Sequence, residues 1–179
     1  MINSKSKNSD EYKKEVLKNR AEILSRSLKD QENKIDTIEI VLFQLDKENF
    51  ALETKYVKEI IPLREYTFLP CAPIFMYGIT NVRRRILPII NIKIFFSLPD
   101  DPKAEKKLVI MENEEVAFAL LIDGFSGIRR LSKNELQATL PTLTGIRQEF
   151  LEGIIADGTV ILNGQKLLTS THLVMDANI

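Results

Sequence analysis

Three consecutive arginines, Arg83, Arg84 and Arg85, lie between two apolar runs in the segment ITNVRRRILPIINI. A guanidinium group can donate two parallel hydrogen bonds to a carboxylate or a phosphate, which the ammonium group of lysine does not reproduce. The pattern therefore points to the binding of an anion. Nucleic acid, an anionic substrate and an acidic surface on a protein partner are all candidates.

The overall charge of the chain argues against nucleic acid. Lysine plus arginine and aspartate plus glutamate number 25 each among 179 residues, so the formal net charge is zero. Proteins that bind DNA or RNA through the phosphates usually carry a basic excess. No aromatic residue alternates with the arginines to stack on bases. We expect no nucleic-acid partner, and a small β-barrel that binds single-stranded nucleic acid through the arginine-rich turn is kept as the alternative.

The other reactive side chains do not form a catalytic or metal-binding pattern. His172 is the only histidine, and no arrangement of Asp, Ser or Cys near it suggests a catalytic triad. Cys71 is the only cysteine, which excludes a disulfide within the chain and leaves too few ligands for a metal. The carboxylate pairs Asp100–Asp101 and Glu114–Glu115 are in turn-like segments, where solvated charge is ordinary. We therefore expect no enzyme activity and no metal or cofactor.

Residues 1–36 are predicted to form an N-terminal extension with an amphipathic α-helix. Ser9 or Asp10 can cap this helix, and apolar residues follow mostly at intervals of three or four. These residues are Tyr12, Val16, Leu17, Ile23, Leu24 and Leu28. The apolar stripe fits either a helix folded back on a sheet or a helix bound in a groove of another chain.

The sequence shows neither a secretion signal nor a membrane helix, so we predict a cytoplasmic protein that does not insert directly into the membrane. The N-terminus lacks the apolar core of a signal peptide. The longest apolar runs are far shorter than the roughly 20 residues that a membrane helix requires.

From Ile38 onward the chain reads as short strands with turn signals every eight to twelve residues, which indicates an all-β domain over residues 37–179. IEIVLFQL and NFALE form one hairpin, and KKLVIMEN and EVAFALLID form a second that is closely similar. Because the pattern restarts near Lys106, we predict two similar small β-barrels, at about 37–98 and about 106–175. Each is too small to bury much surface alone, so we expect them to share one core.

The β domain resembles a known family. YVKEIIPL and LPCAPIFMYGITNVRRRILPIINI are similar to the CheW-type chemotaxis coupling domain, and FALLIDGFSGI, FLEGI and KLL resemble its second half. The resemblance covers roughly Thr37 to Met175 and is specific because the order and spacing hold over that length. The matching residues of the first half are Val57, Glu59, Ile60, Pro73, Gly78, Asn81, Arg83, Pro88 and Ile90.

This resemblance implies two five-stranded β-barrels of the Src-homology type and a non-catalytic adaptor of chemotaxis signal transduction. The expected partners are the regulatory domain of a CheA-type histidine kinase and the cytoplasmic helical tip of a chemoreceptor (a methyl-accepting chemotaxis protein). The protein would be recruited from the cytoplasm to membrane-associated receptor arrays. The resemblance implies that the receptor- and kinase-binding residues are Val57, Glu59, Gly78, Asn81 and Arg83.

Three positions depart from the family pattern. Arg84 stands where the family has glycine, Asn91 stands where it has aspartate, and Gly164 replaces an apolar residue before KLL. A glycine in a turn adopts positive φ without steric cost. Arg84 must therefore tolerate that backbone conformation, or the turn must differ.

Overall fold

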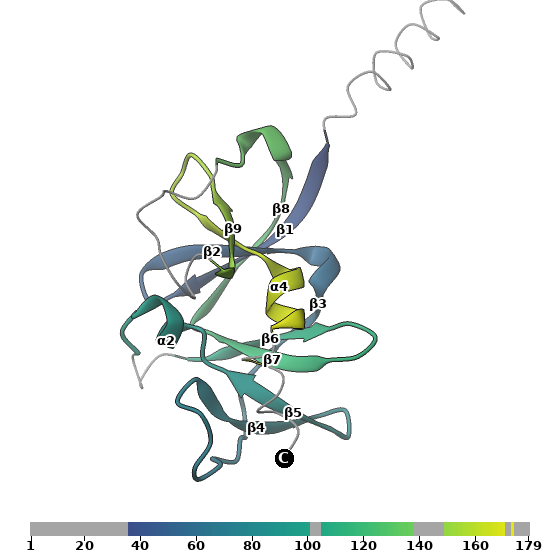
Figure 1. Ribbon diagram of the computed structural model, residues 1–179, viewed down its shortest axis with the longest axis vertical. Helices are drawn as coiled ribbons and strands as arrows, with labels where there is room; N and C mark the ends of the chain where they lie inside the picture. Colours follow the sequence, from purple (N-terminus) through teal and green to yellow (C-terminus); the bar gives the residue numbers. More distant parts are fainter. Residues whose placement is uncertain (1–35, 101–104, 138–148, 171–172, 174–179) are drawn as a thin grey trace, which may run out of the picture. The chain divides into compact units, whose positions relative to one another are not determined.

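The computed structural model describes residues 36–100, 105–137, 149–170 and 173 (Figure 1). The chain divides into two compact units, residues 1–36 and residues 37–179. The predicted N-terminal helix and His172 lie outside the described residues. Within the described residues, no helix has the length and apolar character needed to cross a membrane.

Ten strands in the described residues form two five-stranded sheets. Sheet A has the order β8-β1-β2-β10-β9, and its strands are β1 (Thr37–Leu45), β2 (Glu48–Glu53), β8 (Gly124–Ser132), β9 (Leu151–Ile154) and β10 (Val160–Leu162). Sheet B has the order β3-β6-β7-β5-β4, and its strands are β3 (Val57–Pro62), β4 (Met76–Val82), β5 (Arg85–Ile90), β6 (Lys107–Glu112) and β7 (Ala117–Ile122). The predicted all-β fold with two five-stranded units is confirmed.

The two sheets are interleaved along the chain. β1–β5 form one repeat and β6–β10 form a second, and each repeat gives its first two strands to one sheet and its last three to the other. β3 of the first repeat pairs with β6 of the second, and β8 of the second pairs with β1 of the first. The segments predicted as barrels, about 37–98 and about 106–175, are therefore the two repeats, whereas each sheet combines strands of both. Periodicity reveals which strands are alike, but it does not reveal which strands pair.

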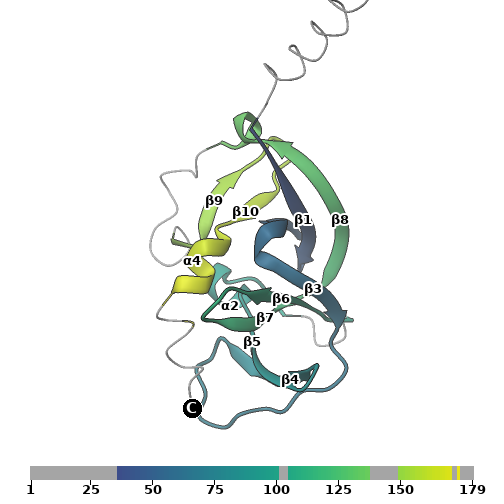
Figure 2. The same cartoon turned by 90° about the vertical axis from the view of Figure 1, so that its right-hand side faces the viewer.

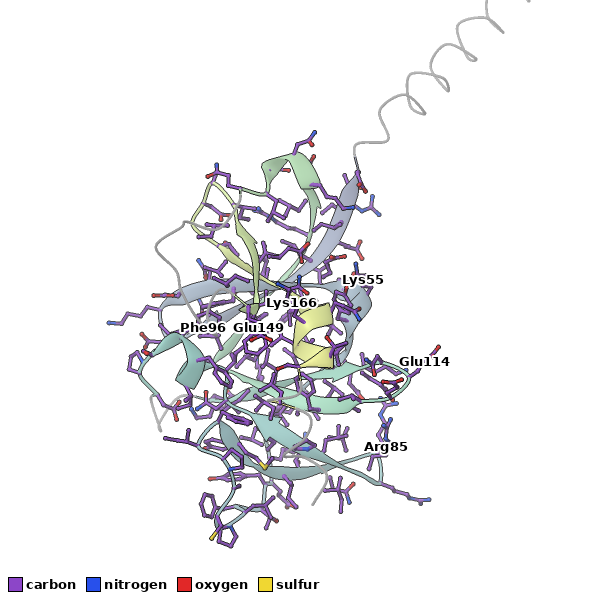
Figure 3. The ribbon with its side chains drawn as sticks, viewed as in Figure 1. Lys55, Arg85, Phe96, Glu114, Glu149 and Lys166 are labelled. Carbon is purple, nitrogen blue, oxygen red and sulfur yellow. The ribbon has the colours of Figure 1, made fainter. Side chains whose placement is uncertain are left out.

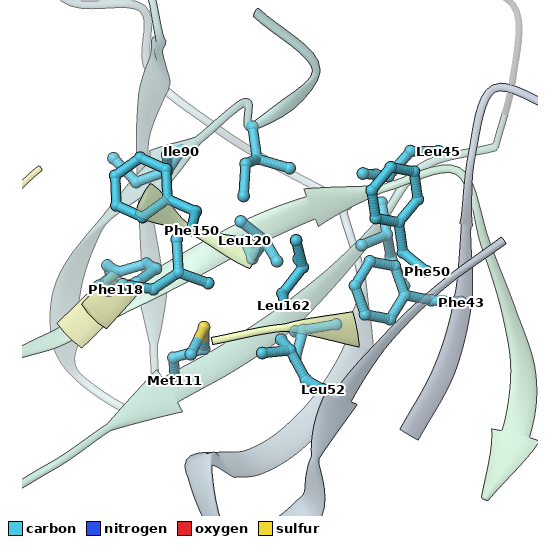
Figure 4. Close-up of a cluster of buried hydrophobic side chains, with 14 of the residues drawn as sticks. Phe43, Leu45, Phe50, Leu52, Ile90, Met111, Phe118, Leu120, Phe150 and Leu162 are labelled. Atoms are coloured by element: carbon cyan, nitrogen blue, oxygen red, sulfur yellow. The ribbon is translucent and has the colours of Figure 1, made fainter. Parts of the chain in front are cut away.

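Strands buried on both faces explain the continuous apolar runs. Along β7, Phe118 and Leu120 point into a cluster shared by the two sheets, whereas Ala119 and Leu121 point into a cluster inside sheet B. The shared cluster takes from β1 and β2 the side chains Val41, Phe43, Leu45, Phe50 and Leu52 (Figure 4). Sheet A encloses its own smaller cluster of Ile38, Ile40, Ala51, Leu131, Ile155 and Ile161. The two sheets thus share one core, as predicted.

Short helical segments connect the strands. They are the 3-10 turns η1 (Thr54–Tyr56) and η2 (Lys133–Glu135) and the helices α2 (Lys93–Phe96) and α4 (Gly164–Thr169). The turn η1 ends at Tyr56, and β3 begins at the next residue. Asn163 caps α4, because its side chain accepts a hydrogen bond from the Lys166 amide at 2.9 Å.

Candidate partner-binding groove

A groove of about 600 Å³ is lined by residues of β3 in sheet B and of β1 and β8 in sheet A. Figure 2 shows the course of these three strands. Val57 and Glu59 are on one wall, and Phe125 and Ile128 of β8 are on the other. Phe125 is 41% exposed and Ile128 is 58% exposed, so both large apolar side chains lie at the surface and not in the core. The remaining lining residues are Glu39, Val41, Thr54, Lys58, Ile60, Ile61, Pro62 and Lys107. The groove is therefore apolar with charged groups along it.

A β-bulge brings both apolar residues of β8 to the same wall. Phe125 pairs with Phe43 and Gly127 pairs with Leu42, so Ser126 is an extra residue in the strand. Residues three apart on a regular strand face opposite sides, and one extra residue returns them to the same side. The sequence prediction did not include Phe125 or Ile128. The signal that could have found them is the pair of glycines that flanks Phe125 in DGFSGI.

The β4–β5 turn brings Arg83 to β3. Val82 pairs with Arg85, and the two residues between them, Arg83 and Arg84, have φ values of 50° and 69°. Two consecutive positive φ values are typical of the two-residue turn that matches the twist of a hairpin. Arg83 Nη2 donates to Glu59 Oε2 at 2.9 Å, although β3 and β4 are at opposite ends of the strand order. Sheet B therefore curls until its first and last strands meet at this ion pair.

The three arginines differ in their contacts. The Arg83 side chain is 80% exposed and keeps further donors free, because a guanidinium has five N–H groups. Arg85, which is labelled in Figure 3, pairs with Glu112 of β6. The hydrogen bond from Arg85 holds the pKa of Glu112 below its ordinary value. Arg84 is exposed and makes no ion pair within the described part of the chain. Two of the three cations are therefore already paired with carboxylates, which weakens the turn as a binding site for a polyanion.

Gly78 lies away from the groove, where the β3–β4 connection passes over β4. Thr67 and Ile79 exchange two backbone hydrogen bonds of 2.8 and 2.9 Å, and a Cβ on Gly78 would lie 2.6 Å from Thr67 O. The second repeat has the same arrangement, because a Cβ on Gly153 of β9 would lie 2.6 Å from Gln137 O. In this fold, both glycines allow a loop to close its sheet.

Asn81 lies in a depression next to the groove. This depression, of about 530 Å³, is also lined by Ile61 and Pro62, which line the groove as well. The structure thus brings Val57, Glu59 and Arg83 together, puts Asn81 beside them, and buries Gly78 elsewhere. The assignment of these five residues to partner binding stays a prediction.

A cluster of two buried lysines and two aspartates lies outside the groove. Lys93 Nζ, with a side chain 0% exposed, contacts Asp100 Oδ1 at 2.6 Å and Asp123 Oδ1 at 2.8 Å. Lys106 pairs with the same Asp100 carboxylate and lies 3.7 Å from Asp123. We call these four residues the buried charge network. Asp100 is exposed, as expected for a carboxylate in a turn, and two buried lysines also bind it.

The pKa values of the network follow from its geometry. Burial alone would lower the pKa of Lys93, but hydrogen bonds and charge from Asp100 and Asp123 raise that pKa above its ordinary value. Burial alone would raise the pKa of Asp100, but the hydrogen bonds from Lys106 and Lys93 lower it. Lys93 is therefore held in its charged form and so is Asp100, and each stabilises the charge of the other. Among the described residues, no three His, Cys, Asp or Glu side chains gather as ligands for a metal ion.

The fold and the groove define a binding module, and comparisons identify its family. A family model for the CheW-like domain matches residues 39–172. The chain is similar to the chemotaxis protein CheW of Treponema pallidum, with 30% identity over 152 residues that cover 80% of this chain and 89% of that protein. It is similar to protein PilI of Pseudomonas aeruginosa, with 24% identity and coverage of 73% and 74%.

A solved structure agrees with this family. The crystal structure of the scaffolding protein TtCheW from Thermoanaerobacter tengcongensis matches with a TM-score of 0.64 and 28% identity, covering 70% of this chain and 84% of that chain. The chain belongs to the CheW-like family. It is a non-catalytic chemotaxis scaffold that couples receptors to a CheA-type kinase, and it is not an enzyme.

Proposed function

We propose that the groove between β3 and β8 binds the cytoplasmic helical tip of a chemoreceptor. The observation that carries this proposal is the apolar wall of Phe125 and Ile128 opposite Val57 and Glu59. A helix with an apolar face fits such a groove through residues three and four apart. The charged groups along the groove would then fix the orientation of the helix.

Arg83 would add a charged contact at the edge of this groove. Its guanidinium already binds Glu59 and is still 80% exposed, so its remaining donors can reach a carboxylate of the receptor. Arg84 is exposed on the same turn and lacks the neighbouring carboxylate that orients Arg83. Arg83 is therefore the arginine that we assign to the receptor.

A protein that couples two partners needs a second surface, and we assign the kinase regulatory domain to the outer face of sheet B. Ile86 of β5 is 69% exposed, and it lines one depression together with Tyr66 of the β3–β4 connection, which is 47% exposed. The same connection exposes Phe68 at 69% and Ile74 at 81%. Exposed apolar residues gathered in one region mark interaction surfaces. Through both contacts the protein would be recruited to membrane-associated receptor arrays.

Binding measured by calorimetry with the full chain tests the two surfaces separately. Ile128→Asp should weaken binding of a receptor-tip fragment by roughly tenfold or more, because it puts a charge on the apolar wall. Ile74→Asp should weaken binding of the kinase regulatory domain and leave receptor binding unchanged. Ile94→Asp, on α2 and 39% exposed, is the matched control that should change neither.

Arginine variants test the charged contact. Arg83→Glu should weaken receptor binding more than Arg84→Glu does, and Arg83→Lys should recover only part of the loss because lysine cannot make the bidentate contact. Equal effects of the two glutamate variants would remove Arg83 from the site. A wild-type protein that binds neither the receptor tip nor the kinase would sink the whole proposal.

A further inference from the structure

The buried charge network lies where the chain crosses from sheet B to sheet A. Asp123 is the single residue between β7 of sheet B and β8 of sheet A. Asp123 Oδ2 accepts a hydrogen bond from the Asp46 amide at 2.6 Å, and the Asp123 amide donates to Gln44 O at 3.0 Å. Asp46 and Gln44 belong to the β1–β2 hairpin of sheet A. One carboxylate therefore holds both the crossing point and a turn of the sheet that the chain enters.

Lys93 anchors that carboxylate to sheet B. It follows β5 and contacts both oxygens of Asp123, at 2.8 and 2.9 Å. A fully buried ammonium is stable only when its hydrogen bonds and charge are matched, so removing it leaves Asp123 without its main partner. Lys106 is no substitute, because it lies 3.7 Å from Asp123 and its closer contact is to Asp100.

The first residues of β8 supply the wall of the groove. Phe125 comes two residues after Asp123, and the bulge at Ser126 sets the side on which Ile128 emerges. Bulges depend on local strand position, and an edge strand has a neighbour on one side only to hold it. β8 is an edge strand that pairs with β1 alone. Its register at the groove therefore depends on how firmly its start is fixed.

We propose that Lys93 and Asp123 are positioning residues for partner binding, which hold the start of β8 so that Phe125 and Ile128 form the wall of the groove. This inference rests on the proposed function of the groove. Neither residue lines the groove. The network acts on affinity through β8, without a contact to the partner.

The test uses the full chain and a chemoreceptor cytoplasmic-tip fragment as the probe. Lys93→Met keeps the length and apolar stem of the side chain and removes its charge. We expect affinity for the fragment to fall roughly fivefold or more. We also expect amide hydrogen exchange to accelerate at residues 125–130 more than at residues 151–162 of the same sheet. Lys166→Met, at an exposed lysine on α4, is the matched control and should change neither quantity.

A double-mutant cycle separates positioning from general destabilisation. If Lys93 acts through β8, its effect on affinity should be less than additive with Ile128→Ala, and additive with Val57→Ala on the opposite wall. Equal acceleration of exchange in both regions, or additive effects in both cycles, would overturn the inference. If Lys93→Met does not fold, Asp100→Asn replaces it, with a smaller loss expected in the same direction and unchanged affinity counting against the proposal.

The outcomes also separate this inference from the proposed function. If Ile128→Ala weakens binding while Lys93→Met and Asp100→Asn bind like wild type, the groove stands and the positioning role falls. If the wild type does not bind the fragment, or if Ile128→Ala and Glu59→Gln have no effect, the groove itself is wrong.

Discussion

In the first repeat, the β4–β5 turn is tied to β3 by Arg83 and Glu59, and in the second repeat the β9–β10 turn is tied to β8 by Asp157 and Arg129. The cation is on the turn in one repeat and on the strand in the other. The distances are similar, 2.9 and 3.2 Å. Both strands, β3 and β8, line the groove. The repeats therefore share the ion pair that joins the turn to the strand and curls each sheet. The charge carried by the turn differs, because it is positive in the first repeat and negative in the second.

The backbones of the two turns differ as well. The β9–β10 turn has Gly158 at φ 84°, and the Asp157 carboxylate accepts a hydrogen bond from the Thr159 amide at 2.9 Å. The β4–β5 turn has two arginines at positive φ, where a side chain costs roughly 1–2 kcal/mol per residue. A turn chosen for stability alone would not carry them. The first turn thus gives up local stability, and this supports a binding role for its exposed cations.

The largest effect is expected at the glycines that the repeats share. Gly78→Val and Gly153→Val should each lower the free energy of unfolding by roughly 3 kcal/mol or more, because the new side chain would overlap a backbone carbonyl that cannot move without opening the sheet. Denaturant unfolding measures both. Gly127→Ala is the control, since a Cβ there meets no atom within 4 Å, although its φ of 140° adds some strain. A folded, fully stable Gly78→Val that fails to bind partners would instead make Gly78 a contact residue.

An intermediate effect is expected from exchanging the turn residues. Arg84→Gly should raise the free energy of unfolding by about 1 kcal/mol, because glycine removes the steric cost of φ 69°. Gly158→Ala should lower it by a similar amount at φ 84°. Chemical denaturation of both variants measures the pair. A destabilised Arg84→Gly would mean that the arginine side chain makes a stabilising contact that offsets the strain.

The class of fold, which is confirmed, and the candidate site residues, whose assignment stays a prediction, were both accessible from the sequence because they depend on local patterns. The hairpins follow from alternating apolar residues and turn signals, and Val57, Glu59 and Arg83 follow from the family pattern. Exchange of strands between the repeats was not predictable, because β3 can continue in either sheet without any change in its own periodicity. Strand pairing is fixed by contacts between residues that are distant in sequence, such as Val57 with Met111.

Phe125, Ile128 and Lys93 were not predicted for the same reason, because their positions depend on contacts between residues that are distant in sequence. Phe125 and Ile128 face one side only because Ser126 bulges against β1, and Lys93 is buried only because Asp100 and Asp123 converge on it from other elements. From the sequence alone, a lysine such as Lys93 is expected at the surface, because the carboxylates that pair with it are not known. The departure at Gly164 has a clear reason in the fold, because a Cβ there would lie 2.2 Å from Cδ2 of Tyr56. The tyrosine ring occupies the space that an apolar side chain would need.

The smallest effect concerns the acidic turn of the second repeat. Hydrogen bonds from Thr159, and to a smaller extent Arg129, hold the pKa of Asp157 below its ordinary value. A carboxyl with a lowered folded-state pKa stabilises the protein above its unfolded pKa of about 3.9, and that stabilisation is lost as the pH falls through the folded value. Asp157→Asn should therefore cost less than about 1 kcal/mol at pH 7, because the side chain is 49% exposed.

Below about pH 4 the difference should shrink, since the wild-type carboxyl becomes protonated and its advantage over asparagine disappears. Urea unfolding midpoints of the wild type and Asp157→Asn at pH 7 and pH 3 measure this convergence. If the difference in unfolding midpoint between wild type and Asp157→Asn is the same at pH 7 and pH 3, the carboxylate does not stabilise its turn. The two turns would then share a backbone arrangement without sharing a stabilising ion pair.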